Sequence, residues 1–287
     1  MNPRFSSAAA REKAVAFLFL FLFAAGLHAQ RVVSLAPGVT EIVFALGHGD
    51  KLVGVTKFCD YPEAANKIAK IGGFLDINIE ALVALAPDLV ITYPEHAAKL
   101  NFLRRQARVI SVAHGRLSEL LRSIREIGRA LDAEEQAGRL VAGIRSRLRQ
   151  VSHRTAGRKR VRALCIAGRS PNDLRNMIAI GRKDFLNDLL EIAGGTNAYP
   201  GRIDYPNISL ESVIRMRPEL IIEISSRFEG IPDERIFAFW KPLVMVPAVA
   251  ARRIRIIKDS FWLRPGPRVG QIAEELARLL HASADLP

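Results

Sequence analysis

Two stretches of the chain repeat the same order of polar and apolar positions. Residues 79–95 read IEALVALAPDLVITYPE, and residues 210–226 read LESVIRMRPELIIEISS. In each stretch a helical spacing of apolar residues stops at a proline, Pro87 or Pro218, and a short apolar run typical of a buried strand follows. One helix–strand unit that occurs twice predicts a protein built from two similar halves.

The start of each repeated helix carries signals of its own. Asn78 and Ser209 stand where a side chain can accept hydrogen bonds from the free backbone N–H groups of a first turn. Glu80 and Glu211 follow within that turn, where the positive end of the helix dipole favours a carboxylate. Both helices are therefore predicted to begin next to these residues.

Further strands and helices alternate along the chain. Thr40 is expected to cap a helix that ends near Leu46. Alternation of short strands and helices predicts parallel sheets and an α/β fold. The other predicted strands cover 31–36, 52–56, 161–167 and 253–257, and the other predicted helices cover 184–193 and 269–280.

A long helical tract separates the two halves. Residues 117–130 place leucine and isoleucine at helical spacing, and Asp132 is expected to cap a second helix that runs to about Val151. We therefore expect two Rossmann-like lobes with parallel sheets, joined by a single long, rigid helix. The expected boundaries are an N-terminal lobe over 30–131, a linking helix over 132–155 and a C-terminal lobe over 156–287.

Residues 1–29 resemble an export signal. A positive start at Arg4 and Arg11 precedes an apolar, uncharged run over 14–27, and small residues follow. The run is shorter than the roughly 20 residues that a membrane-spanning helix needs, although an uncleaved anchor stays an alternative. No cysteine lies near the expected cleavage point. We therefore expect a periplasmic protein without a lipid anchor.

Cysteine content and charge narrow the class of protein. The two thiols, Cys59 and Cys165, fall in different halves, and we expect them to be unpaired and mostly buried. The net charge is +13, and residues 139–160 hold eight basic residues and no acidic one. Because no nucleic-acid-binding motif is present, we interpret this tract as a solvated helix face and expect no nucleic acid partner.

Motifs for catalysis are missing from the sequence. It lacks the GxSxG, GxGxxG and GxxxxGK[ST] patterns of nucleophile elbows, dinucleotide sites and P-loops. Its histidines are scattered without the HExxH spacing of a zinc site. We therefore expect a binding protein with no enzymatic activity, catalytic cofactor or metal site.

Four aromatic rings fall in turns beside the predicted strands and helices. They are Tyr61 in CDYP, Phe74 in GGFLDIN, Tyr93 in VITYPE and Tyr205 in IDYPNI. Phe74 and Tyr205 both stand four residues before a helix cap. Ligands of parallel sheets bind beyond the carboxyl ends of the strands, and rings supply a large apolar contact area there. We expect these rings to line a ligand cleft; the alternative is that each ring only packs its loop onto the sheet.

The segment DSFWLRPGPR follows the last predicted strand. Asp259, Ser260 and Arg264 offer polar groups to a ligand, and Phe261 or Trp262 offers a ring to stack on it. We include Ser260, Trp262 and Arg264 among the expected ligand-binding residues. An ordinary strand-to-helix turn is the alternative interpretation.

The mature chain resembles the periplasmic substrate-binding proteins of cobalamin, haem and iron-siderophore ABC importers. The resemblance rests on RVVSLAPGVTEIVFALG, DYP, NIEALVALAPDLVI, SLESVIRMRPELII and SFWLRPGPR. It implies two α/β lobes joined by one rigid helix, with the ligand between the lobes and little closure on binding. The DYP turn, the paired helix-start glutamates and FWLRPGPR are most similar to the cobalamin-binding branch.

The resemblance also implies roles for individual residues. Cleft rings of the cobalamin-binding branch correspond to Tyr61, Phe74, Tyr93 and Tyr205, with phenylalanine or tyrosine at some positions where other members have tryptophan. The second-lobe cysteine pair of some members is missing, because that segment reads LLEIAGG. The implied function is that of a monomer that binds a corrinoid, with cobalamin as the transported ligand.

Glutamates on the surface have an implied role as well. In this family one glutamate on each lobe docks onto arginines of the membrane permease, and Glu80 and Glu211 match those positions. The resemblance therefore implies delivery of the ligand to the permease subunits of an ABC importer. Without the resemblance, the two glutamates need only stabilise their helix starts, by about 0.3–1 kcal/mol each.

Other functions stay open from the residues alone. A haem ligand would want an axial tyrosine or histidine, and an anionic ferric siderophore would want several arginines. The tyrosines available for iron are Tyr61, Tyr93 and Tyr205, and the arginines available for an anion are Arg264, Arg169, Arg175 and Arg202. An exported metal-dependent hydrolase, a different class, would require histidines and carboxylates clustered at one cavity.

Overall fold

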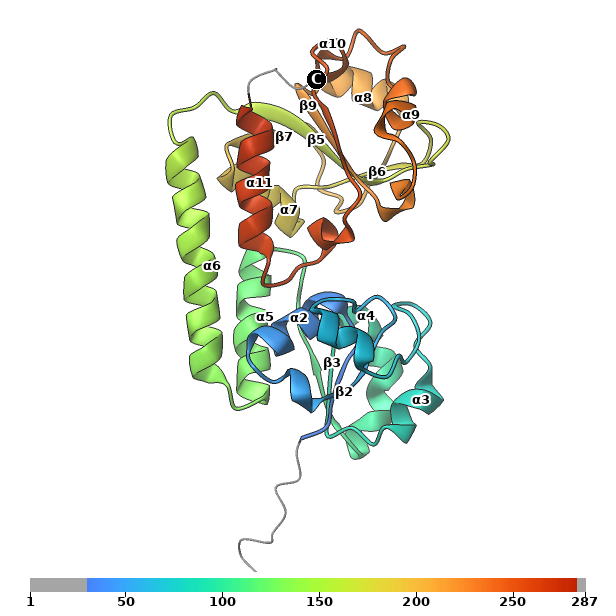
Figure 1. Cartoon of the computed structure of the whole chain (residues 1–287), viewed down its shortest axis with the longest axis vertical. Coiled ribbons are helices and arrows are strands. Elements are labelled where there is room, and N and C mark those ends of the chain that lie inside the picture. The colour runs from blue at the N-terminus through green and yellow to red at the C-terminus, as the bar shows by residue number, and fades with distance from the viewer. Residues whose placement is uncertain (1–29, 283–287) are drawn as a thin grey trace, which may run out of the picture.

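The chain folds into two α/β lobes beside a long helix, α6 (Figure 1). The structure is a computed structural model that describes residues 30–282. The expected export signal and its alternative role as an anchor therefore lie outside the described residues. Among residues 30–282, no helix is both long and apolar enough to cross a membrane.

The N-terminal lobe is built on a four-stranded parallel sheet with the strand order β2-β1-β3-β4. Parallel neighbours need crossover connections, and short helices supply them. The strands are β1 (Val32–Ser34), β2 (Leu52–Val55), β3 (Leu89–Thr92) and β4 (Arg108–Ser111). The helices are α2 (Pro37–Ala45), α3 (Ile79–Ala84) and α4 (Pro94–Ala97), with 3₁₀ turns at 49–51, 63–67 and 98–105.

The C-terminal lobe has a six-stranded sheet in which four strands run parallel. These are β5 (Val161–Gly168), β7 (Gly195–Asn197), β9 (Leu220–Ile224) and β10 (Ile254–Ile257). Two further short strands, β6 (Met177–Ala179) and β8 (Asn207–Ile208), extend the sheet by antiparallel pairing of β6 with β5 and of β8 with β6. These two strands, together with β4 and β7, were not predicted from the sequence. The helices are α7 (Phe185–Ile192), α8 (Leu210–Met216), α9 (Asp233–Ala238), α10 (Pro247–Ala250) and α11 (Val269–His281), with 3₁₀ turns at 226–228 and 260–263. The predicted α/β fold with parallel sheets is confirmed.

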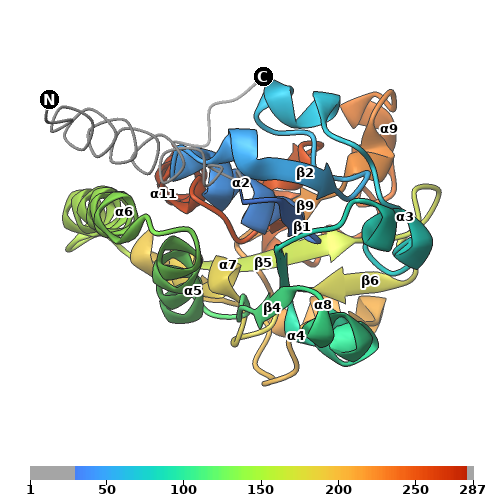
Figure 2. The same ribbon diagram turned by 90° about the horizontal axis from the view of Figure 1, so that it is seen from below.

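Helices α5 (Leu117–Ala130) and α6 (Glu134–Thr155) lie side by side along one side of the molecule (Figures 1 and 2). α6 has 22 residues, which corresponds to a length of roughly 33 Å. Its buried residues recur every three or four positions and share one apolar cluster with α2 of the N-terminal lobe and α11 of the C-terminal lobe. Because α6 packs against both lobes, it is suited to hold their spacing. The domain boundaries at 132 and 155 stay a prediction.

The capping residues of the repeated helices lie where the sequence predicts them. The Asn78 side chain accepts a hydrogen bond from the Ala81 backbone N–H at 2.9 Å, and the Ser209 hydroxyl accepts one from the Ser212 N–H at 3.3 Å. The two repeated units therefore begin in the same way in both lobes.

Two other predicted caps are wrong. Helix α2 begins three residues before Thr40, at Pro37, because proline suits the first position of a helix and lacks the N–H that would need a cap. Asp132 adopts a left-handed backbone with φ of 56°, and Ala133 precedes α6 without a side-chain cap. Asp132 therefore turns the chain between α5 and α6 and does not cap the second helix.

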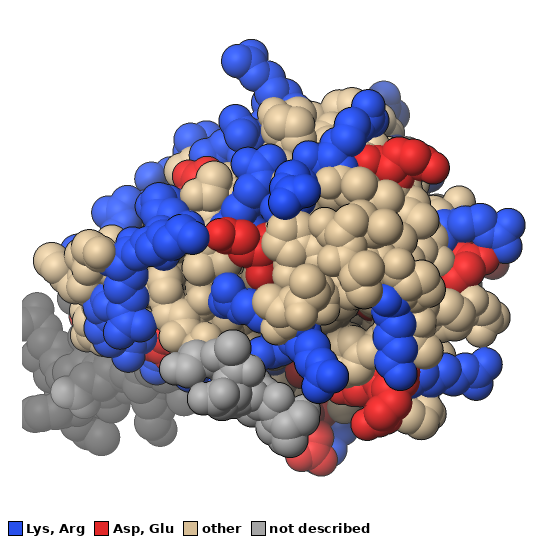
Figure 3. Space-filling view, turned by 90° about the horizontal axis from the view of Figure 1, so that it is seen from above, with Lys and Arg blue, Asp and Glu red and all other residues tan. Residues whose placement is uncertain are grey.

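Thiols and basic residues lie as expected. Cys59 and Cys165 are both buried and unpaired, and burial raises the pKa of the Cys165 thiol to about 12. Along α6 the basic side chains of Arg145, Arg149 and Arg154 are exposed. Lysine and arginine are also spread over the outer end of the C-terminal lobe (Figure 3). The excess positive charge is therefore solvated.

Candidate functional site

Residues that follow the strands of both sheets meet between the lobes. Arg264, which follows β10, donates hydrogen bonds to the carboxylate of Asp60, which follows β2. A Cβ atom placed on Gly38 of α2 would lie 2.2 Å from the carbonyl oxygen of Pro265, so this close approach requires glycine. The carboxyl ends of the two sheets therefore face one interlobe region, the position at which α/β sheets bind ligands.

The N-terminal side of this region is a cluster of rings. The Phe74 ring lies 6.2 Å from the Tyr93 ring and 4.5 Å from the His96 ring, centroid to centroid. Tyr93 in turn lies 3.9 Å from the ring of His114. The structure thus brings together two of the predicted rings, Phe74 and Tyr93, and adds two histidines from the ends of β3 and β4.

Tyr93 is held tightly at the centre of this cluster. Its side chain is only 6% exposed, and a Cβ atom on Gly38 would lie 2.9 Å from its hydroxyl oxygen. Burial raises the pKa of the Tyr93 phenol above its ordinary value, so the hydroxyl stays protonated. Tyr93 therefore offers an apolar edge and a neutral hydroxyl.

The two histidines have different surroundings. The His114 Nε2 atom lies 3.0 Å from a carboxylate oxygen of Glu95. His96 is buried, its Nε2 atom has no hydrogen-bond partner among the described residues, and burial lowers the pKa of His96. Neither histidine was assigned to the site from the sequence, because no strand was predicted before His114 and both histidines lack metal-ligand spacing.

The C-terminal side of the region centres on Tyr205 and Asp184. Tyr205 is half-exposed, and its hydroxyl donates a hydrogen bond to Asp184 at 2.5 Å. Asp184 is buried and also caps α7 by accepting the Leu186 backbone N–H at 2.8 Å. Burial raises the pKa of Asp184 to about 6, although both hydrogen bonds oppose the shift. This carboxylate fixes the orientation of the Tyr205 ring.

The two sides are close enough to influence each other electrostatically. Burial raises the pKa of Tyr205, and Asp184 and Tyr93 raise it further. His114 is among the groups that lower the pKa of Asp184. We call the five residues Phe74, Tyr93, His114, Asp184 and Tyr205 the interlobe site.

A polar hollow of about 500 Å³ adjoins the carboxyl ends of β5, β9 and β10 in the C-terminal lobe. The Ser260 hydroxyl, a predicted site residue, accepts a hydrogen bond from Arg264 at 2.7 Å. That hydroxyl keeps its own hydrogen free to donate to a ligand. The polar residues that line the hollow include Ser170, Asn176, Ser225, Ser226, Arg227 and Ser260.

The arginines considered for an anionic ligand are mostly neutralised. Arg169 is buried and donates two hydrogen bonds to the buried Glu223 carboxylate, at 2.5 and 3.1 Å. Arg264 pairs with Asp60, and these hydrogen bonds hold the pKa of Asp60 below its usual value. Arg175 pairs with Asp173 on the surface, and Arg202 is exposed without an ion pair among the described residues.

Trp262 does not face the interlobe site. Its side chain is 2% exposed and belongs to the main apolar core, because the 3₁₀ turn at 260–263 directs the indole inward. The structure therefore places Trp262 in the apolar core, and its role in ligand binding stays a prediction. An apolar ring beside two prolines fits a core position as well as a ligand contact, which is why the sequence did not distinguish them.

Tyr61 lies apart from the other predicted rings. It is half-exposed, and its ring lies 4.1 Å from the guanidinium of Arg268. It lines a hollow of about 530 Å³ between α2, α6 and α11. The structure therefore places Tyr61 at the contact between the lobes, beside Asp60, and leaves its role in ligand binding a prediction.

Glu80 and Glu211 are exposed in the first turns of α3 and α8. A hydrogen bond from Ser209 lowers the pKa of Glu211, which keeps it ionised. The two helices lie in different lobes, on the side away from α6 (Figure 1). Both carboxylates are therefore accessible to a partner.

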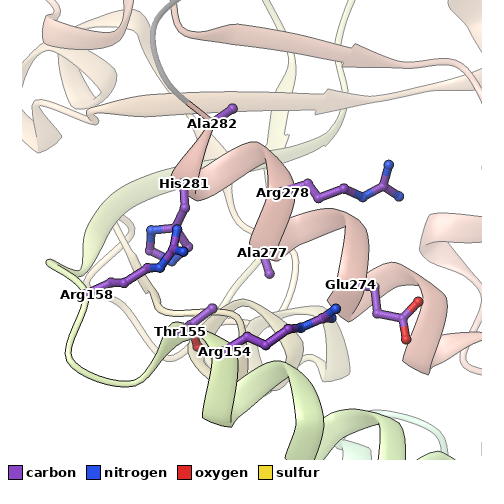
Figure 4. Close-up of a pocket in the computed structure, with 8 residues that line it drawn as sticks. All are labelled: Arg154, Thr155, Arg158, Glu274, Ala277, Arg278, His281 and Ala282. Atoms are coloured by element: carbon purple, nitrogen blue, oxygen red, sulfur yellow. The ribbon is translucent and has the colours of Figure 1, made fainter.

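Another hollow, of about 620 Å³, lies between the C-terminal ends of α6 and α11 (Figure 4). It is lined by basic residues, among them Arg154, Arg158 and Arg278. Cations at these positions stabilise the negative ends of both helices. The hollow contains none of the predicted site residues, and its basic lining is explained by the helix ends.

Metal-dependent hydrolysis has no matching cluster in the described chain. Within residues 30–282, no group of three or more histidine, cysteine or acidic side chains is arranged to hold a metal ion. The arrangement offers apolar rings, hydroxyl groups and neutralised arginines, which are the components of a ligand-binding site.

Fold and site together are those of a two-lobed α/β binding protein. The Periplasmic binding protein family matches residues 32–260, and the chain belongs to this family. It is 28% identical over 243 residues to the vitamin B12-binding protein of Vibrio parahaemolyticus. The aligned residues cover 83% of this chain and 85% of that protein.

Two solved structures extend the comparison. The apo form of the periplasmic heme-binding protein RhuT from Roseiflexus sp. RS-1 superimposes with a TM-score of 0.76 at 26% identity, covering 89% of this chain and 99% of that one. The periplasmic vitamin B12-binding protein BtuF of Vibrio cholerae gives a TM-score of 0.75 at 25% identity, covering 88% and 96%. The family is one of binding proteins, a non-enzymatic kind, and the chain has a periplasmic substrate-binding role.

Proposed function

We propose that this protein binds a corrinoid, with cobalamin as the natural ligand, between its lobes in the periplasm. It then delivers the ligand, as a monomer, to the permease subunits of an ABC importer. The similarity to the vitamin B12-binding proteins of two Vibrio species supports this ligand. The similarity to a heme-binding protein makes haem the second candidate.

The choice of a corrinoid rests on the protonation state of the two tyrosine hydroxyls in the interlobe site, those of Tyr93 and Tyr205. The Tyr205 hydroxyl donates to Asp184, and Tyr93 is almost fully buried. The raised pKa values of both tyrosines disfavour the phenolate, the form in which tyrosine binds ferric iron most strongly. The half-exposed Tyr205 ring is thus available for packing, whereas both phenol oxygens are poorly suited to bind haem iron. A haem at this site would instead need His114 as its axial ligand.

A ferric siderophore has less support. Ferric catecholates are strongly anionic, and a site for them needs cations that are not already paired. Arg169 is committed to Glu223 and Arg264 to Asp60, both by charge-assisted hydrogen bonds. An uncharged ligand edge fits these two neutralised arginines better than a polyanion does. Among the residues that line the polar hollow, Arg227 is the one cation without an ion pair in the described chain.

Isothermal titration calorimetry against cyanocobalamin, haemin and a ferric catecholate tests the proposal. We expect saturable one-to-one binding of cyanocobalamin and no comparable binding of the other two ligands. Binding of haemin alone would assign the protein to haem uptake. Binding of none of the three would reject all the ligand classes considered.

Docking on the permease is tested by charge reversal. In the proposed complex, Glu80 and Glu211 contact permease arginines, so Glu80→Arg combined with Glu211→Arg should stop ligand transport in reconstituted vesicles. The ligand affinity of the double variant should stay unchanged, because both residues lie on the surface away from the interlobe rings. Glu63→Arg with Glu234→Arg, also exposed and one in each lobe, is the matched control. Normal transport by the first double variant would remove the docking proposal.

A further inference from the structure

Two adjacent residues of the N-terminal lobe are held by the C-terminal lobe. Asp60 and Tyr61 follow β2 in the loop that the sequence links to ligand binding. Arg264 donates to the Asp60 carboxylate, and the Arg268 guanidinium lies over the Tyr61 ring. Both arginines come from the segment between β10 and α11, so one short segment of one lobe holds one short loop of the other.

Arg268 is fully engaged in this contact. Its Nε and Nη2 atoms donate to the two carboxylate oxygens of Glu41 at 2.8 and 2.6 Å, a bidentate pair. The Glu41 side chain is 3% exposed and that of Arg268 is 17% exposed. The guanidinium also lies 4.1 Å from the Tyr61 ring and 4.5 Å from the Phe261 ring. A planar guanidinium that is held by two hydrogen bonds to one carboxylate and lies against two rings is restricted to a single orientation.

The same contacts reach the ligand region. Ser260 lines the polar hollow at the strand ends of the C-terminal lobe, and its hydroxyl accepts a hydrogen bond from Arg264. Arg264 continues to Asp60, and the next residue along the chain is Tyr61. A chain of polar contacts and one peptide link therefore joins the wall of one lobe to the half-exposed ring of the other.

We propose that Arg268 is a positioning residue for ligand binding, which holds the Tyr61 ring in its binding orientation by stacking on it while bound to Glu41. The ring of one lobe is then in place only when the other lobe is seated against it. This inference rests on the proposed function, namely that a ligand occupies the region between the lobes, and on the predicted role of Tyr61 as one of the rings that contact it. It does not depend on which ligand that is.

A double-mutant cycle between Arg268 and Tyr61 tests the proposal. Arg268→Gln and Tyr61→Leu should each weaken binding by about five- to tenfold, the range expected for loss of a stacked guanidinium–ring contact. The combined variant should bind no more weakly than Tyr61→Leu alone, because Arg268 acts through that ring. The ligand is whichever of cyanocobalamin and haemin the unchanged protein binds.

Two further variants separate positioning from folding. Glu41→Gln should reproduce the loss seen with Arg268→Gln, since the bidentate pair is what orients the guanidinium. Arg147→Gln is the matched control, because Arg147 lines the same hollow as Tyr61 and has no ion pair among the described residues. It should leave affinity unchanged. Losses that multiply in the Arg268–Tyr61 double variant, or no loss in Arg268→Gln, would overturn the proposal.

A readout that needs no ligand distinguishes this inference from the proposed function. The chain has four tyrosines, so protein labelled with 3-fluorotyrosine should give four ¹⁹F resonances, and Tyr61→Leu assigns one of them. Arg268→Gln should shift or broaden the Tyr61 resonance and leave that of Tyr199 in place. An unchanged Tyr61 resonance contradicts the positioning role. Failure of every ligand to bind, with the Tyr61 shift present, rejects the proposed function and keeps the structural contact.

Discussion

The two lobes use the same helix–strand unit and end it differently. Both units begin with a capping residue and a glutamate, and both continue into a fully buried strand. At the strand end, Thr92 and Tyr93 of the N-terminal lobe correspond to Glu223 and Ile224 of the C-terminal lobe. Tyr93 joins a ring cluster, whereas Glu223 forms a buried ion pair with Arg169.

The difference separates what the fold needs from what the ligand needs. The helix start is preserved in both lobes because it stabilises the helix and presents a carboxylate on the surface. The strand end has diverged, so that one lobe offers rings and the other offers polar groups above a buried pair. Two similar lobes can thereby bind the two different sides of one ligand.

The largest expected effect comes from breaking the buried pair. Glu223→Ala should lower the free energy of unfolding by about 3–5 kcal/mol, because it leaves the Arg169 charge buried without its partner. The corresponding change in the other lobe, Thr92→Ala, removes one contact to His96 at 3.4 Å and should cost only about 1 kcal/mol. Urea unfolding of both variants measures the difference. Equal losses would show that the two strand ends are energetically alike.

The carboxylate beneath Tyr205 should give the C-terminal side a pH dependence. The pKa of Asp184 is about 6 in the folded protein against an ordinary value of 3.8, so the fold favours its protonated form. Its contribution to stability is complete below pH 3.8 and is lost as the pH rises through about 6. The loss amounts to about 3 kcal/mol.

Asp184→Asn should flatten this part of the stability profile. Asparagine keeps the cap on α7 and does not ionise. Unfolding free energies of this variant, measured at intervals from pH 4 to pH 7, should therefore lack the decrease that the ionisation of Asp184 causes. Tyr93→Phe, on the opposite side of the interlobe site, is the control and should keep the profile. A profile that is the same with and without Asp184 would contradict the assigned pKa.

Ring packing and hydroxyl chemistry can be separated at two facing positions. Tyr93→Ala and Tyr205→Ala should each weaken ligand binding by about tenfold, which corresponds to about 1.4 kcal/mol of lost ring contact. The phenylalanine variants keep the ring and should bind almost as well as the unchanged protein. Calorimetry with the preferred ligand measures all four. Severe loss in Tyr93→Phe would point to ligation through the hydroxyl and hence to haem, whereas loss in Tyr205→Phe alone would reflect the missing hydrogen bond to Asp184.

The smallest predicted effect tests the shared part of the two units. Asn78→Ala and Ser209→Ala each remove a helix cap and should each cost about 1 kcal/mol of unfolding free energy. Their similarity is the prediction, because both side chains make the same bond in the same position. A loss in only one lobe, measured by urea unfolding, would show that the two helix starts are not equivalent.

Much of the fold follows from local patterns in the sequence. The α/β class, the repeated caps and the unpaired thiols depend on periodicity, capping chemistry and composition, which act over a few residues. The short strands β6 and β8 lack enough residues to show an alternation, and proline at position 37 outweighed the capping signal of Thr40. Local sequence patterns therefore predicted most helices and strands but not all of their first and last residues.

The site was only partly predictable for a different reason. Phe74, Tyr93 and Tyr205 stand at strand ends or before helix caps, and position alone indicated them. The pairs Arg169–Glu223, Tyr205–Asp184 and Arg268–Glu41 join residues from different elements, so no spacing in the sequence reveals them. Burial of Trp262 likewise depends on how a turn packs against distant helices.

A crystal structure of the protein with bound cyanocobalamin tests the central claim most directly. Our account predicts that the corrin ring lies between the lobes, with Phe74 and Tyr93 on one side and Tyr205 on the other. Corrinoid bound instead in the hollow between α2, α6 and α11, or an interlobe region that stays empty at saturating ligand, would contradict it.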